Sequence, residues 1–125
     1  MSTTRWQGIF PAVTTKFHPD ERIDAEGTAR HIDFQIRNGI HGVVTCGSLG
    51  EASTLSLEEK LDVARIAMEA SGGRVPVLAN VSETSTRDAL RYIDGANKLG
   101  VAGYMVMPSV IYVAEIGKAS CRERV

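Results

Sequence analysis

The chain has 125 residues, of which 43% are hydrophobic and 23% charged, the composition of one ordinary globular domain. Its formal net charge of −1 comes from 14 basic and 15 acidic residues scattered along the sequence, so it lacks the basic surface that nucleic acid or an anionic membrane requires. No stretch approaches the roughly 20 apolar residues of a membrane span, and the N-terminus has no apolar signal-peptide core. We therefore expect a cytoplasmic protein with a small-molecule partner.

Four short apolar runs predict β-strands. Each run is continuously apolar rather than alternating, which is typical of a parallel sheet whose two faces are both covered. The runs bordered by glycine at 39–44 and 100–105 also resemble each other, as repeated βα units would. The four predicted strands are Gly8–Thr15, Gly42–Cys46, Val75–Ala79 and Tyr104–Met107.

Helices are predicted between these strands by their capping residues and by apolar positions that repeat at helical spacing. Asp24 can cap the first helix, Ser56 and Glu59 form a capping box at the second, and Ser85 is a weaker cap for the third. Glycines at 39, 72, 73 and 100 supply the stop signals. The class is therefore α/β, and repeated βα units favour a (β/α)8 barrel over a doubly wound sheet.

A complete barrel of that kind needs about 250 residues, so four strands correspond to its N-terminal half. We expect residues 1–114 to form this partial barrel. The last eleven residues, EIGKASCRERV (115–125), have no apolar periodicity and resemble the conceptual translation of a sequencing adapter, so we interpret them as a non-native tail. Cys46 and Cys121 have no CxxC neighbour, and the three histidines are isolated, so we expect no metal site.

The loop after the second predicted strand, TCGSLGEAST (Thr45–Thr54), combines glycine, hydroxyl and carboxylate side chains. Loops at the carboxyl ends of strands form the active-site face of βα-repeat proteins. Gly47 and Gly50 can adopt positive φ and admit a ligand closely, so the amides of Ser48 and Leu49 can converge on an anion. A carboxylate fits better than a pyrophosphate, because no GxGxxG motif or P-loop lysine is present. By spacing alone, a plain turn is an equal alternative.

Four segments resemble the dihydrodipicolinate synthase and N-acetylneuraminate lyase family in order and separation over residues 6 to 114. They are GIFPAVTTKF, GVVTCGSLGEASTLSLEEKLDVA, GGRVPVLANVSETSTRDA and LGVAGYMVMP. The resemblance implies a (β/α)8 barrel, usually a homo-tetramer, in which a lysine forms a Schiff base with a 2-keto acid such as pyruvate. The iminium serves as electron sink for aldol cleavage, condensation or dehydration, so no metal or other cofactor is implied.

The resemblance also implies roles for individual residues. Ser48 matches a hydroxyl residue that joins a proton relay or holds the keto-acid carboxylate, with Gly47 and Gly50 beside it. Leu49 stands where a second threonine is common, so only its backbone amide can bind substrate. Tyr112 is a candidate substitute for an aromatic residue of the synthases, although packing is the alternative. These departures favour a sugar-acid or hydroxy-amino-acid branch over lysine biosynthesis.

The family's two central catalytic residues, a tyrosine after strand five and a lysine on strand six, would lie beyond this chain. Lys60 and Lys98 are predicted on solvated helix faces, and Lys16, the only amine near the loop end, is also predicted to be solvated. Glu51 is expected to bracket the loop, with a general base as the alternative, and Glu83 is expected at the rim of the third strand, with substrate contact as the alternative. We therefore expect this chain to be inactive by itself.

Two alternatives come from other functional classes. One is a complete flavodoxin-like α/β module whose serine loop cradles a phosphate or nucleotide. The other is a non-catalytic half-barrel that assembles with a partner chain as a structural or regulatory protein.

Overall fold

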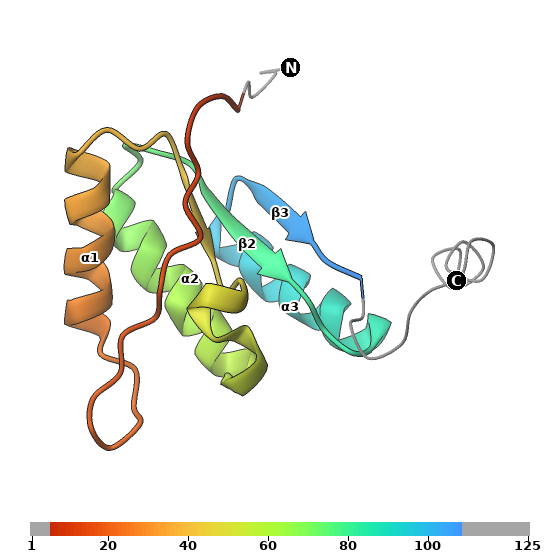
Figure 1. Ribbon diagram of the computed structural model, residues 1–125. Coiled ribbons are helices and arrows are strands. Elements are labelled where there is room, and N and C mark those ends of the chain that lie inside the picture. Colours follow the sequence, from red (N-terminus) through yellow and green to blue (C-terminus); the bar gives the residue numbers. More distant parts are fainter. Residues whose placement is uncertain (1–5, 109–125) are drawn as a thin grey trace.

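The computed structural model describes residues 6–108. Tyr112 and the predicted tail at 115–125 lie outside the described residues. In the described part, strands and α-helices alternate along the chain, with two short 3-10 turns after the first strand (Figure 1). The elements are α1 (Ala25–Arg37), β1 (Val43–Thr45), η1 (Ser48–Gly50), η2 (Ala52–Thr54), α2 (Leu57–Ser71), β2 (Val77–Val81), α3 (Thr86–Leu99) and β3 (Gly103–Val106).

The strands form a parallel sheet in the order β1-β2-β3. Val44 pairs with Leu78 across the first junction, and Asn80 pairs with Met105 across the second. Each strand therefore lies beside the next one in the sequence, without the reversal of order that marks a doubly wound sheet. The flavodoxin-like alternative does not fit this topology within residues 6–108.

The prediction of a full strand at Gly8–Thr15 is wrong, because this segment makes only an isolated parallel bridge, from Ala12 to Val44. The backbone bonds are Val44 N to Pro11 O and Val13 N to Val44 O, both 3.0 Å. Pro11 has no N–H to continue this ladder in one direction. At the other end of the bridge, Cys46 leaves the extended conformation with φ 56°, and the ladder stops there as well. The segment keeps the position of a first barrel strand without its full pairing.

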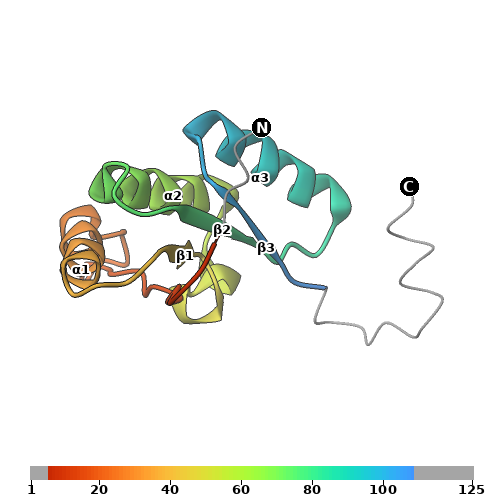
Figure 2. The ribbon, with the colours of Figure 1, turned by 90° about the horizontal axis from the view of Figure 1, so that it is seen from above.

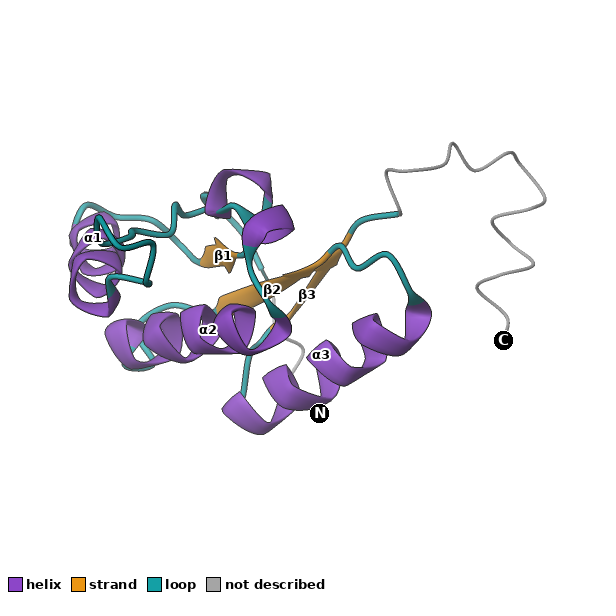
Figure 3. Ribbon diagram, turned by 90° about the horizontal axis from the view of Figure 1, so that it is seen from below, coloured by secondary structure: helices purple, strands orange, loops and turns teal. Residues whose placement is uncertain are grey.

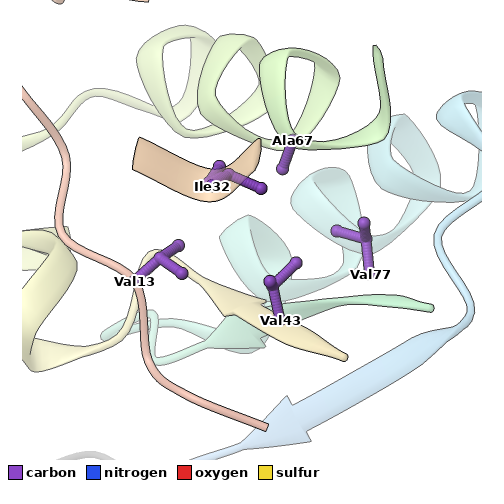
Figure 4. Close-up of a cluster of buried hydrophobic side chains, with 5 residues drawn as sticks. All are labelled: Val13, Ile32, Val43, Ala67 and Val77. Carbon is purple, nitrogen blue, oxygen red and sulfur yellow. The ribbon is translucent and has the colours of Figure 1, made fainter. Parts of the chain in front are cut away.

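All three α-helices cover the same face of the sheet (Figure 2 and Figure 3). Val43 and Val77 point from β1 and β2 toward Ile32 of α1 and Ala67 of α2, and these side chains form a buried cluster with Val13 (Figure 4). A second cluster joins the helix-facing residues of β2 to α3, namely Ala79, Val81, Tyr92 and Ala96. One helix-covered face is the arrangement of a barrel wall, whose other face lines the interior.

The helix termini follow the predicted caps. Asp24 Oδ1 accepts from Gly27 N at 2.8 Å, and the Ser56–Glu59 capping box is present at α2. Ser85 Oγ accepts from Asp88 N at 3.1 Å. Gly72 and Gly100 end α2 and α3 in the left-handed conformation, with φ 55° and 83°. No helix within residues 6–108 is long and apolar enough to cross a membrane.

Candidate active site at the carboxyl end of the sheet

The serine loop, residues 46–54, begins where β1 ends and folds into the two 3-10 turns η1 and η2. Gly47 O accepts from Gly50 N at 3.0 Å and from Ala52 N at 3.3 Å, which closes the first turn on itself. Thr15 Oγ1 donates to Gly50 O at 2.8 Å and ties the loop to the first segment. The loop therefore has a defined shape at the carboxyl edge of the sheet, where the active-site loops of βα proteins lie.

The predicted role of the two glycines as positive-φ positions is wrong. Gly47 is extended, with φ −76° and ψ −172°, and Gly50 is not among the positive-φ residues. Cys46 and Glu51 adopt φ 56° and 60° instead, which costs these two side chains conformational energy. Position 50 favours glycine for space, because a Cβ there would make a tight contact of 3.1 Å with Val13 O.

Ser48 and Leu49 occupy the outer turn of the loop. Both are exposed, and the Leu49 side chain is 66% accessible. The bonds that close the turn are donated by the amides of Gly50, Glu51 and Ala52, so the first two amides of η1 have no partner inside the loop. An exposed hydroxyl and two outward amides at a strand end can hold a small anion, but they leave Ser48 outside any buried pocket of this part of the chain.

The inner face of the sheet lies on the side away from the helices and below this loop. A hollow of about 290 Å³ runs along it, lined by Trp6, Phe10, Val44, Leu78, Tyr104, Met105 and the backbone near Gly8. The residues of the serine loop do not line this hollow. Gly47 faces the inner side near its upper edge, since a Cβ there would meet Ala12 Cβ at 3.8 Å and Met105 Cε at 4.0 Å.

Sequence reasoning missed Asn80, which is a buried polar residue of this inner face. It is 1% exposed, and its Nδ2 donates to Cys46 O at 2.9 Å and to Ser82 Oγ at 3.1 Å. Its neighbours Ala79 and Val81 pack against α3, so the alternation of a strand directs Asn80 to the opposite side. A polar residue in an otherwise apolar strand was the available signal.

Lys60 was predicted on a solvated face, and this prediction is wrong. Its side chain is only 8% exposed, and Nζ lies 2.5 Å from Oε1 of Glu83, whose side chain is 15% exposed. Lys60 belongs to the first turns of α2 and Glu83 follows β2, so the pair joins two segments at the carboxyl end of the sheet. The ammonium is buried because a carboxylate 23 residues away neutralises it.

The thiol of Cys46 is fully buried beneath the loop. Burial raises its pKa from 9.0 to about 11, so the thiol is protonated at neutral pH and is a poor nucleophile. Burial likewise raises the pKa of the neighbouring Tyr92 phenol far above its usual value. Both groups serve packing around the loop rather than proton transfer.

Parallel βα units with helices on one face and functional loops at the carboxyl edge define the class of (β/α)8 barrels, of which this is the N-terminal part. Comparison with known proteins identifies the family. Residues 5–114 match the model of the dihydrodipicolinate synthetase family, and the chain belongs to that family.

The relatives are enzymes of two named activities. The chain is 38% identical over 104 residues to a 4-hydroxy-tetrahydrodipicolinate synthase of Methanosphaerula palustris, and 40% identical over 106 residues to an N-acetylneuraminate lyase of Rhizobium meliloti. These matches cover 82% and 85% of the chain and 36% of each relative. The chain thus spans about a third of the length of these relatives.

A solved structure shows the same fold. The crystal structure of YagE, a prophage protein of the dihydrodipicolinic acid synthase family from E. coli K12 in complex with pyruvate, superposes with a TM-score of 0.85 and 35% sequence identity. The superposition covers 94% of this chain and 40% of that protein. The predicted family, fold and fragment nature are therefore confirmed.

Proposed function

We propose that this chain is the N-terminal part of a class I lyase or aldolase that forms a Schiff base with a 2-keto acid such as pyruvate. The observation that carries the proposal is the family match over residues 5–114, together with the serine loop at the carboxyl edge of the sheet. The reaction would be aldol cleavage, condensation or dehydration, with the iminium as electron sink.

In this proposal the serine loop binds the keto-acid carboxylate. The amides of Ser48 and Leu49 and the Ser48 hydroxyl supply the donors, and Gly47 and Gly50 shape the turn. Leu49 contributes no hydroxyl, so Ser48 is the only side-chain donor of its turn. Tyr112 is kept as a further candidate from the sequence, outside the described residues.

The reactive amine is proposed to lie outside residues 1–125. Lys60 is held in its ion pair with Glu83 on the helix side of the sheet, and Lys98 pairs with Asp94 on the surface of α3. Lys16 is exposed, and its backbone amide is bonded to Thr28 of α1. None of these three lysines belongs to the inner face on which the loop and Asn80 meet. We therefore propose that the 125-residue chain is inactive. From the family resemblance we also propose that the whole enzyme is a homo-tetramer.

The test begins with the reading frame of the source gene beyond residue 114. The proposal expects further βα units, with a lysine on the sixth strand, in place of the segment 115–125. The full-length protein, incubated with pyruvate and borohydride, should gain the mass of one reduced adduct per chain on that lysine. The 125-residue chain should gain none. An adduct on Lys16, or no adduct on the full-length protein, contradicts the proposal.

The role of the loop is tested separately with Ser48→Ala. Loss of a hydrogen bond to a charged carboxylate corresponds to about 1.5–3 kcal/mol, so the pyruvate concentration for half-maximal trapping should rise about 10-fold or more. Ser53→Ala, an exposed serine of the next turn, is the matched control and should leave trapping unchanged. If Ser48→Ala and Ser53→Ala need the same pyruvate concentration for half-maximal trapping, Ser48 does not bind the carboxylate.

A further inference from the structure

His41 holds the N-terminal segment, residues 6–9, at the amino end of the sheet. His41 N donates to Ile9 O at 2.9 Å, and Ile9 N donates back to His41 Nδ1 at 3.0 Å. The imidazole ring lies so close to Gly8 that a Cβ at position 8 would collide with it. Gly8 also has φ 92°, a conformation that favours glycine. Two reciprocal hydrogen bonds and a ring contact therefore attach the segment to the turn before β1.

The second of these bonds fixes the protonation state of the ring. A backbone N–H can only donate, so Nδ1 is the unprotonated acceptor and the proton of the neutral ring is on Nε2. Histidine is the side chain that gains a further proton between about pH 5 and 8. Because this proton would go to Nδ1 and face the Ile9 N–H, the bond exists only while the ring is neutral. Its contribution is therefore present at higher pH and is lost as the pH falls.

The charged side chains near His41 are already paired with one another. Residues 6–12, which include both contact residues of the ring, contain no acidic or basic side chain. The end of α1 carries Asp33 and Arg37, and the turn before β2 carries Arg74. Asp33 lies 2.8 Å from the Arg37 guanidinium and 2.7 Å from that of Arg74. Asp33 is thus paired twice and forms no ion pair that would compensate a protonated His41.

The N-terminal segment covers part of the inner face of the sheet. Trp6, Gln7 and Gly8 line the hollow of about 290 Å³ together with side chains of the strands. The Trp6 ring lies against Gly103 of β3, where a Cβ would collide with it. Within residues 6–108, the two bonds to His41 are the only hydrogen bonds between residues 6–9 and the rest of the chain. Loss of one of them therefore weakens the attachment of Trp6 to the inner face.

We propose that His41 is a pH-sensitive clasp for the N-terminal segment. With a neutral ring, the segment stays on the inner face and Trp6 covers Gly103. With a protonated ring, the bond from Ile9 N is replaced by repulsion between two N–H groups, so the segment is released and the hollow opens at the amino end of the sheet. This conformational change is independent of the proposed reaction.

Trp6 is the only tryptophan of the chain, so its fluorescence reports the position of the segment. In the 125-residue chain, quenching of Trp6 by acrylamide should increase from about pH 7.5 to about pH 5.5. Over the same range, hydrogen exchange of the Ile9 amide is measured by NMR and corrected for its intrinsic rate at each pH. Its protection should fall about 5-fold, the factor expected for one lost hydrogen bond.

Three variants assign the effect to the ring. In His41→Asn, Oδ1 takes approximately the place of Nδ1 and accepts without titrating, so Trp6 should stay protected at both pH values. His41→Leu has no acceptor, and Trp6 should be quenched at both pH values as strongly as in the unmodified chain at the lower pH. His18→Asn changes an exposed histidine outside the clasp and should keep the pH dependence of the unmodified chain.

Two results would overturn the proposal. One is Trp6 quenching that does not change with pH in the unmodified chain. The other is the same pH dependence in the unmodified chain and in His41→Asn, because acid would then loosen the segment through groups other than this ring.

Discussion

Lys60 and Glu83 are the residues whose environment departs furthest from what their types suggest. Replacing Lys60 by Met leaves the Glu83 carboxylate largely buried without a partner, which should destabilise the fold by about 2–3 kcal/mol after allowance for its partial exposure. The double variant Lys60→Met with Glu83→Leu should recover most of this loss, since apolar replacements of a buried pair are often neutral. Urea denaturation of the 125-residue chain measures both values.

The exposed pair Lys98–Asp94 is the matched control for this prediction. Its side chains are 75% and 70% accessible and its Nζ to Oδ2 distance is 2.9 Å. Lys98→Met should therefore change the stability by less than about 1 kcal/mol. Equal losses in Lys60→Met and Lys98→Met would show that burial of the first pair has no energetic consequence.

Cys46 allows a chemical test of loop packing. A pKa of about 11 and complete burial keep its thiolate rare, whereas a thiol in the unfolded chain has an ordinary pKa. In a Cys121→Ser background, alkylation by iodoacetamide at pH 8 should be at least about 100-fold slower in the folded chain than in urea. Mass spectrometry against time gives both rates. Similar rates would mean that the serine loop opens freely.

At the scale of the element, α2 depends on its N-terminal cap. Ser56 Oγ accepts from Glu59 N at 3.2 Å, and Glu59 Oε2 accepts from Ser56 N at 2.7 Å. Ser56→Ala should therefore lower the free energy of unfolding by about 1 kcal/mol. Ser53→Ala, three residues earlier and outside the helix, should have almost no effect. Thermal or urea unfolding that does not distinguish the two variants would contradict the role of the cap.

At the scale of the whole molecule, residues 6–108 leave the inner face and the outer edge of β3 uncovered. Val106 and Trp6 are 69% and 46% exposed, and Met105 is 37% exposed on the inner face. Open strand edges and exposed apolar faces promote association. Sedimentation of the 125-residue chain should therefore show a weight-average mass that rises with concentration.

Two charge substitutions locate the surface that associates. Val106→Lys, on the edge strand, should shift the association to higher concentration. Leu90→Lys, at an apolar position of α3 that is 61% exposed, should not. A monodisperse monomer at all concentrations would contradict the prediction, as would equal effects of the two variants.

The sequence by itself determined the α/β class, the order of βα units, the helix caps and the family. These depend on local chemistry: a hydroxyl or carboxylate at a helix start, a glycine at its end, and apolar runs of strand length. The serine loop was also placed correctly at a strand end, although the torsion angles inside it were not, since Cys46 and Glu51 take the positive φ expected of the glycines.

Only the tertiary structure decided which polar side chains are buried and where they point. Lys60 meets Glu83 across 23 residues, and Asn80 meets Cys46 across 34. Pro11 and Cys46, acting on two different segments, reduce the first strand to a single bridge. These long-range contacts form only when the sheet packs against its helices. The residue type at one position does not indicate which distant residue will lie beside it.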